Sequence, residues 1–204
     1  LRAAASDSAF LALYDSVMSA FDADLSAQDS WFAINHPDLL HAPVAYFSME
    51  FAIHQPLKIY SGGLGFLAGS HLRSAYELRQ NMVGIGILWK YGYYDQARNQ
   101  DQTLQVTFME KNFCFLEDTN IKFQILIHEH PVWVKAYYLN PETFNSAPLF
   151  LLSTDLPEND YVSQTITHRL YDANVATKVA QFILLGVGGA KLIDELGFNP
   201  DVYH

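Results

Sequence analysis

A glycine-rich segment between a short apolar run and a helical pattern limits the possible fold most strongly. Residues 61–69 read Ser-Gly-Gly-Leu-Gly-Phe-Leu-Ala-Gly; they follow the apolar run Val44–Phe47 and lead into a helical pattern over Leu67–Leu78. Glycines at such a junction allow positive φ and a close approach of the backbone to a ligand. The N–H groups at the start of the helix favour an anion such as phosphate. The alternative is a turn that only lets the strand and the helix pack together.

Strand-like and helical segments alternate along the chain. We expect strands over Val44–Phe47 and Val83–Trp89, with a crossover helix over Leu67–Gln80 between them. The other expected strands are Gln102–Met109, Phe123–Ile127, Val132–Tyr138, Leu149–Ser153 and one after residues 197–201, and the other long helix is Asn174–Ile193. Strands that alternate with helices predict a doubly wound, Rossmann-like α/β domain. The middle strands alternate in polarity and predict a β-rich antiparallel insertion.

The N-terminal part reads as a separate unit. Residues 1–43 are expected to form a helix and linker, and residues 44–204 the Rossmann-like domain. Within residues 6–28, apolar side chains recur at helical spacing. Trp31 and Phe32 follow, and we expect them to pack this helix onto the domain.

The composition excludes several classes of function. The chain has 204 residues and a formal net charge of -10, with only 12 lysines and arginines. An acidic chain without a basic cluster argues against binding nucleic acid or an anionic membrane, whereas a neutral polyhydroxyl substrate meets no such objection. The single cysteine, Cys114, cannot form an intramolecular disulfide, which fits a cytoplasmic location. The apolar stretch Phe182–Ala190 is too short to span a bilayer, and the N-terminus does not read as a signal peptide.

Five further motifs accompany the glycine-rich segment in a fixed order. They are Tyr46–Phe51, Val83–Trp89, Tyr91–Gln96, Leu151–Asn159 and Arg169–Tyr171. In order and spacing they resemble the N-terminal domain of α-glucan phosphorylases, above all the compact bacterial and archaeal branch. The resemblance implies a two-domain (GT-B) glycosyltransferase that carries out reversible phosphorolysis of α-1,4-glucan to glucose 1-phosphate. A weaker likeness is to glycogen and starch synthases, which share this architecture and a Gly-Gly-Leu-Gly loop.

The resemblance implies a role for the glycine-rich loop. In the family it lies against the 5′-phosphate of pyridoxal phosphate and against the reacting inorganic phosphate. Gly62, Gly63, Leu64 and Gly65 are therefore expected to bind these phosphates. The family's cofactor lysine lies in a C-terminal domain, and none of the seven lysines here is expected to hold the cofactor. We thus expect an N-terminal part of such an enzyme, inactive by itself, whose own C-terminal domain is its partner.

Glu50 follows the first apolar run and is a candidate catalytic residue. A carboxylate beside phosphate repels it unless a cation or a proton intervenes, so we expect Glu50 to hold an arginine or a water network. A solvated strand end or an ion pair within the fold is the alternative.

Four more residues are candidates for the site. Lys178 and Gln181 lie three apart on one face of the second long helix and resemble the family's Arg-x-x-Gln. Lys178 is the catalytic candidate, although lysine binds anions less directionally than arginine, and Gln181 is a candidate substrate contact; a surface lysine and a helix-capping glutamine are the alternative. Asp155 and Asn159 follow a strand and are expected to contact sugar hydroxyls; a turn around Pro157 is the alternative.

No metal site is expected, because His128-Glu129-His130 lacks a third ligand at the spacing of a known zinc signature. Two rival functions stay open: a nucleotide-sugar glucan synthase domain, and a non-catalytic carbohydrate-binding or assembly module of the same fold. We also expect self-association into a homo-oligomer, because a missing partner domain would leave apolar surface exposed.

Overall fold

The structure is a computed structural model that describes residues 4–26 and 30–204. Its centre is a six-stranded sheet in the order β5-β6-β7-β2-β1-β8. The strands are β1 (Val44–Phe47), β2 (Met82–Ile87), β5 (Glu117–Ile127), β6 (His130–Leu139), β7 (Leu149–Ser153) and β8 (Val202–Tyr203). The pairs β7-β2, β2-β1 and β1-β8 are parallel, and the pairs β5-β6 and β6-β7 are antiparallel. This mixed α/β fold with a mostly parallel sheet is compatible with the Rossmann-like domain that the sequence predicts.

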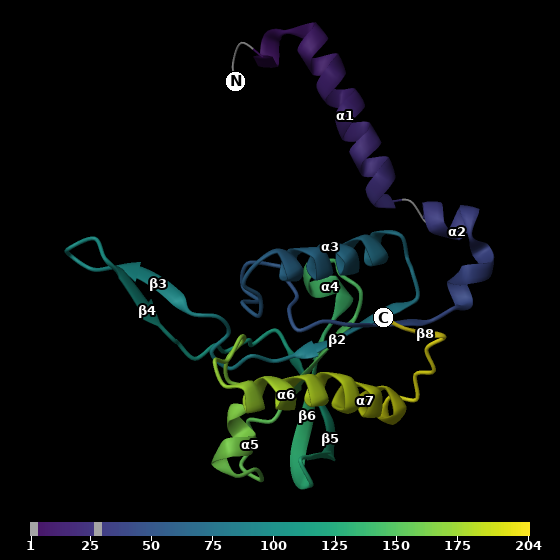
Figure 1. The fold of residues 1–204 in the computed structure, drawn as a ribbon. Helices are drawn as coiled ribbons and strands as arrows, with labels where there is room; N and C mark the ends of the chain where they lie inside the picture. The colour runs from purple at the N-terminus through teal and green to yellow at the C-terminus, as the bar shows by residue number, and fades with distance from the viewer. Residues whose placement is uncertain (1–3, 27–29) are drawn as a thin grey trace.

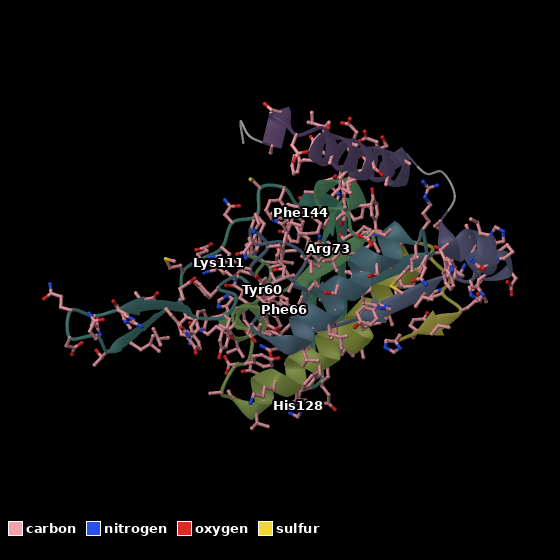
Figure 2. The ribbon with its side chains drawn as sticks, turned by 90° about the horizontal axis from the view of Figure 1, so that it is seen from above. Tyr60, Phe66, Arg73, Lys111, His128 and Phe144 are labelled. Carbon is pink, nitrogen blue, oxygen red and sulfur yellow. The ribbon has the colours of Figure 1, made fainter. Side chains whose placement is uncertain are left out.

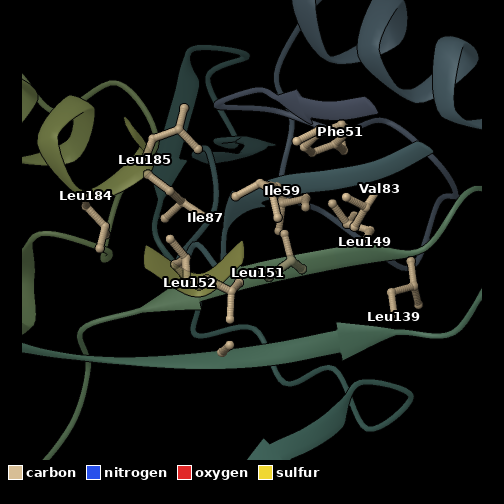
Figure 3. Close-up of a cluster of buried hydrophobic side chains, with 14 of the residues drawn as sticks. Phe51, Ile59, Val83, Ile87, Leu139, Leu149, Leu151, Leu152, Leu184 and Leu185 are labelled. Atoms are coloured by element: carbon tan, nitrogen blue, oxygen red, sulfur yellow. The ribbon is translucent and has the colours of Figure 1, made fainter. Parts of the chain in front are cut away.

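Helices cover both faces of the sheet (Figure 1). On one side lie α3 (Gly63–Glu77) and α4 (Pro141–Phe144). On the other side lie α5 (Tyr161–Thr165), α6 (Val175–Ile183), a π-helical segment (Leu184–Gly188) and α7 (Gly189–Glu195). Every residue of β2 is buried, as expected of a central strand between two helical layers. Figure 3 shows the core on this strand, where Ile87 lies near Leu152 and Leu185.

The expected antiparallel insertion divides into two parts. β5 and β6 extend the central sheet through β7. β3 (Asp95–Arg98) and β4 (Leu104–Thr107) form a separate two-stranded ribbon that projects from the body (Figure 1). The turn between β5 and β6 contains His128 and Glu129, both with positive φ, so these two residues lie in a hairpin turn and not within a strand.

The second long helix runs without a break from Val175 to Glu195, through the π-helical segment. Asn174 caps its start, since its side chain accepts hydrogen bonds from the amides of Ala176 and Thr177. By length and composition alone this helix could cross a membrane, unlike the shorter apolar stretch considered in the sequence. Buried residues such as Leu184 and Leu192 pack one side of it against the sheet, while Val179 and Phe182 are exposed.

The N-terminal elements are η1 (Ala4–Ser6), α1 (Ser8–Ser26), α2 (Trp31–Asn35) and η2 (Pro37–His41). The predicted first helix is confirmed, but none of its described side chains is buried, and Figure 1 shows it apart from the helical layers. Trp31 is 60% exposed and its ring contacts His36, so the expectation that it anchors α1 to the domain is wrong. Ser30, which caps α2, ties that helix to the end of α3, because its hydroxyl donates to the carbonyl of Leu78.

Candidate functional site

Two of the candidate residues and one further charged side chain lie at the carboxyl ends of three neighbouring parallel strands. Glu50 follows β1, Lys90 follows β2 and Asp155 follows β7. Because parallel strands end at the same edge of the sheet, these three residues share that edge, where ligands bind in open α/β sheets.

Glu50 is almost fully buried, with 1% of its surface exposed. Its Oε2 accepts hydrogen bonds from the amides of Ser61, at 2.6 Å, and Gly62, at 3.4 Å, and its Oε1 accepts one from the hydroxyl of Tyr171. Within the described part of the chain the recorded partners of this carboxylate are Ser61, Gly62 and Tyr171 and include no arginine, so the expected arginine or water network stays a prediction. Backbone amides and a phenol offset the cost of burying the charge.

The glycine-rich segment differs from the expectation in conformation and in where the helix starts. α3 begins at Gly63 and not at Leu67. Gly62 has a φ of -150°, and Gly92 and Gly197 are the glycines with positive φ in residues 4–26 and 30–204. The expectation of positive φ here is therefore wrong, because these glycines cap and open a right-handed helix.

Gly65 is the position in this segment where packing requires a glycine. A Cβ there would lie 2.6 Å from the Cβ of Tyr60 and 3.0 Å from Oε2 of Glu50, whereas a Cβ at Gly63 would meet nothing within 4 Å. The ring of Phe66 packs edge-on against Tyr60, and Figure 2 shows these two side chains next to each other. The start of α3 is thus fixed against Glu50 and Tyr60.

The first turn of α3 offers three free donors. The amides of Gly63, Leu64 and Gly65 find no acceptor among the described residues, and the first bond of the helix runs from the amide of Phe66 to the carbonyl of Gly62. Glu50 already occupies the amide of Gly62. Helix N-termini favour anions because unpaired N–H groups and the helix dipole act together. The phosphate cradle predicted at residues 62–65 therefore has suitable donors at three of its four positions.

Tyr171 joins this site from the segment before α6. It has a φ of 60°, in the left-handed region, which brings its hydroxyl to Glu50. The hydrogen bond to Glu50, followed by burial, raises the pKa of Tyr171 to about 12. Its ring meets Tyr93 edge-on, with 6.3 Å between centroids, and Tyr93 packs on Tyr94. Tyr171 belongs to the motif Arg169–Tyr171, but no local pattern assigns it to the site, because it lies 121 positions from Glu50 along the chain.

Asp155 lies in a small charge cluster. Its carboxylate contacts Nζ of Lys90 at 2.7 Å and Nε2 of His168 at 3.2 Å. Burial alone would raise the pKa of Asp155, but the hydrogen bonds from Lys90 and His168 outweigh it and hold the pKa below its ordinary value. The hydrogen bond to Asp155 in turn raises the pKa of Lys90. No spacing in the sequence indicated Lys90 or His168 as partners, since they come from other segments.

Asn159 is buried, and its side chain bonds within the fold. Its Oδ1 accepts from the amide of Trp133, and its Nδ2 donates to the carbonyls of Trp133, at 2.8 Å, and Thr154, at 2.7 Å. It thus ties β6 to the loop after β7. Its predicted contact with sugar hydroxyls stays a prediction, and the structure gives its amide a role in packing.

Lys178 and Gln181 point to different surroundings. Gln181 is 1% exposed, and its Nε2 donates to the carbonyls of Ile166, at 3.0 Å, and Arg169, at 3.1 Å. Lys178 is exposed, and its side chain has no recorded partner within residues 4–26 and 30–204. Gln181 therefore fixes the segment that leads to Tyr171, while Lys178 stays available to a ligand or another chain segment.

Metal ligation finds no support in the described residues, which contain no group of three or more His, Cys, Asp or Glu side chains that could hold an ion. His130 pairs with Asp160, at 2.7 Å between Nε2 and Oδ2. Asp160 caps α5, and its bond with the amide of Ser163 is the main reason that its pKa is lowered to about 2.

Comparisons with known proteins bear on this geometry. Residues 1–57 match a family described as "Protein of unknown function (DUF3417)". The chain is 56% identical to an uncharacterized protein of Methanocaldococcus jannaschii over 162 residues, or 79% of this chain and 31% of that protein. It is 34% identical to the maltodextrin phosphorylase of Thermococcus litoralis over 215 residues, or 100% of this chain and 25% of that enzyme. It is 31% identical to a glycogen phosphorylase of Mycobacterium tuberculosis over 174 residues, or 79% of this chain and 20% of that enzyme.

The chain thus spans between 20% and 31% of the length of these relatives. The resemblance that the motifs predict is confirmed: over most of its length, the chain is homologous to maltodextrin and glycogen phosphorylases.

Proposed function

We propose that this chain forms the phosphate-binding wall of the catalytic cleft of an α-glucan phosphorylase, which converts α-1,4-glucan and phosphate reversibly to glucose 1-phosphate. The observation that carries the proposal is the start of α3. There, buried Glu50 accepts hydrogen bonds from the amides of Ser61 and Gly62, and the next three amides have no acceptor among residues 4–26 and 30–204. The names of the relatives support the same reaction class.

In this proposal the amides of Gly63, Leu64 and Gly65 bind phosphate oxygens, and the helix dipole stabilises the charge. Glu50 positions these donors and does not contact the anion, because both of its oxygens already accept hydrogen bonds from the protein. Lys178, exposed and unpaired in the described part of the chain, is the catalytic cation candidate. Asp155, Asn159 and Gln181 stay predicted as substrate contacts, of which Asp155 is the least enclosed by the fold.

The first turn of α3 also fits the 5′-phosphate of pyridoxal phosphate, because that group is likewise an anion in need of N–H donors. Gly63, Leu64 and Gly65 would hold it, and when bound its phosphate assists proton transfer in the reaction. We further propose the two-domain GT-B architecture, with residues 44–204 as the first domain, residues 1–43 as an appended helix and linker, and a cytoplasmic location.

A chimera tests the proposal. The segment of the T. litoralis maltodextrin phosphorylase that matches this chain is replaced by the chain, and glucose 1-phosphate is measured from maltodextrin and phosphate. We expect phosphorolysis, and its loss in Glu50→Gln but not in the control Glu129→Gln, which lies in an exposed turn. A chimera that melts cooperatively and binds maltodextrin without phosphorolysis would instead support the non-catalytic module.

A further inference from the structure

We infer that a cavity between the β5–β6 hairpin, α5 and α6 binds a small neutral ring compound with one hydrogen-bonding group, such as a phenol. The cavity measures about 770 Å³, and its lining includes His128, Val132, Val162, Ile166, Thr177 and Ile183. This volume lies within the range of about 300–1,000 Å³ that small-molecule sites occupy. The cavity shares no residue with the first turn of α3, so the inference does not rest on the proposed function.

Three elements from separate parts of the chain enclose this cavity: the end of the β5–β6 hairpin, α5 and the first turns of α6 (Figure 1). Its floor is buried, since Val132, Ile166 and Ala180 are 1%, 6% and 8% exposed. Figure 2 shows His128 and Phe66 on opposite sides of the yellow-green helix, so the cavity and the start of α3 are separate places. A recess with a buried floor and walls from three elements suits a compact molecule.

The charges of the lining favour a neutral ligand. The carboxylate of Asp160 accepts hydrogen bonds from the amide and the hydroxyl of Ser163, both at 3.0 Å, and pairs with His130 at 2.7 Å. Among the described residues, the lining contains no lysine or arginine. A cationic ligand would compete with His130 for Asp160, and an anionic ligand would lie near Asp160 without a lysine or arginine partner. A neutral ligand meets neither cost.

Polar groups lie beside the apolar floor of the cavity. The ring of His128, the hydroxyl of Thr177 and Nδ2 of Asn174 have no recorded partner within residues 4–26 and 30–204. Hydroxyl, imidazole and carboxamide groups can bond to a single hydroxyl of a ligand. A sugar, which carries hydroxyl groups all round, would lose hydrogen bonds to water against the floor. A phenol places its ring on the apolar surface and keeps its one polar group for these side chains.

Binding of 2-naphthol to the 204-residue chain tests the inference, because this compound is neutral near pH 7. The imidazole proton signals are followed by NMR, and the signal of His128 is identified by its loss in His128→Gln. We expect a saturable shift of this signal with a Kd of about 100 μM, as ligands of this size reach. The signal of His41, which is exposed at the end of η2, should not move.

Two further ligands test the expected chemistry. The compound 2-naphthoate has the same ring system with a carboxylate, and it should bind at least tenfold more weakly. Maltotetraose or inorganic phosphate at about 10 mM should leave the affinity for 2-naphthol unchanged, because neither offers an apolar body to the floor of the cavity.

Val162→Trp should weaken the binding of 2-naphthol at least tenfold, because the larger side chain occupies part of the cavity. Val162 is 74% exposed, so the variant should fold, which circular dichroism checks. Tyr161→Trp is the matched control, since Tyr161 is 76% exposed and does not line the cavity; its affinity should stay within twofold of the wild type. Ala176→Trp fills the same cavity from α6 and provides a second test.

Four results overturn the inference. They are a His128 signal that does not shift with 2-naphthol up to about 2 mM, binding of 2-naphthoate as tight as that of 2-naphthol, unchanged affinity in both folded cavity-filling variants, and a His128 signal that changes with protein concentration alone. The last result would mean that a second copy of the chain covers the cavity. Phosphorolysis by the chimera depends on the start of α3, so either proposal can fail while the other stands.

Discussion

The hydroxyl of Tyr171 donates a hydrogen bond to Glu50, a residue 121 positions earlier in the chain. The other oxygen of the same carboxylate accepts the amide of Ser61 at 2.6 Å. Behind Tyr171, the side chain of Gln181 holds the carbonyls of Ile166 and Arg169. A continuous set of contacts therefore joins α6 to the start of α3 through one buried carboxylate, so that the conformation of the segment before α6 and that of the glycine-rich segment depend on each other.

Tyr171→Phe should destabilise the chain by about 1 kcal/mol, because it removes one hydrogen bond to a charged acceptor at a half-exposed site. The free energy of unfolding in urea measures the effect. Tyr161→Phe is the matched control: Tyr161 is 76% exposed, and its hydroxyl has no recorded partner within the described residues. Equal stability of the two variants would mean that the Tyr171–Glu50 contact contributes nothing.

The same contact predicts a loss of stability at alkaline pH. The hydrogen bond to Glu50 raises the pKa of Tyr171 from 10.0 to about 12. Below about pH 10 the phenol is protonated in both the folded and the unfolded chain, and the contribution of the contact is complete. Between pH 10 and 12 only the unfolded chain loses the proton, so the free energy of unfolding falls. The difference in that free energy between wild type and Tyr171→Phe should shrink from about pH 9 to about pH 11; a constant difference would contradict the assignment.

The order of the elements could be predicted from the sequence because each carries a local signal. The apolar run Val44–Phe47 coincides with β1, and the predicted strand Leu149–Ser153 coincides with β7. The predicted crossover helix starts four residues late, at Leu67, because glycines at 63 and 65 read as a loop although they form the first helical turn. The anchoring role predicted for Trp31 is wrong for a different reason: its large apolar side chain indicated burial, but it is largely exposed in the structure.

Partners within the site depend on tertiary contacts that no local pattern encodes. A carboxylate after a strand indicated that Glu50 has a role, but its real partner, Tyr171, comes from a distant segment. Helical spacing indicates that Lys178 and Gln181 lie toward one side of the same helix, and both lie in α6. It does not tell which of the two side chains is buried. Gln181 lies under the segment 166–169, and Lys178 faces outward.

Two glycines of the same helical turn should respond differently to alanine. Gly65→Ala places a Cβ 2.6 Å from the Cβ of Tyr60, so the chain should lose about 1–3 kcal/mol of stability through overpacking. Gly63→Ala meets nothing within 4 Å and should be neutral or stabilising by up to about 1 kcal/mol, since alanine favours a helix over glycine. Thermal and urea unfolding of both variants measure this. A comparable loss for Gly63→Ala would show that the start of α3 is more constrained than the space around it indicates.

Gln181→Leu and Lys178→Met should separate a packing role from a role in ligand binding. Gln181→Leu leaves two carbonyls without their donor, one of them in the core, and should cost about 1–3 kcal/mol of stability. Lys178→Met changes an exposed side chain and should alter stability by no more than about 0.5 kcal/mol.

In the chimera with the T. litoralis enzyme, Lys178→Met should nevertheless lower phosphorolysis if the cation meets the substrate anion. Lys178→Arg should retain phosphorolysis, because arginine binds phosphate at least as directionally. Full activity of Lys178→Met would remove Lys178 from the site and leave the amides of α3 as the only anion-binding groups that this chain provides by our proposal.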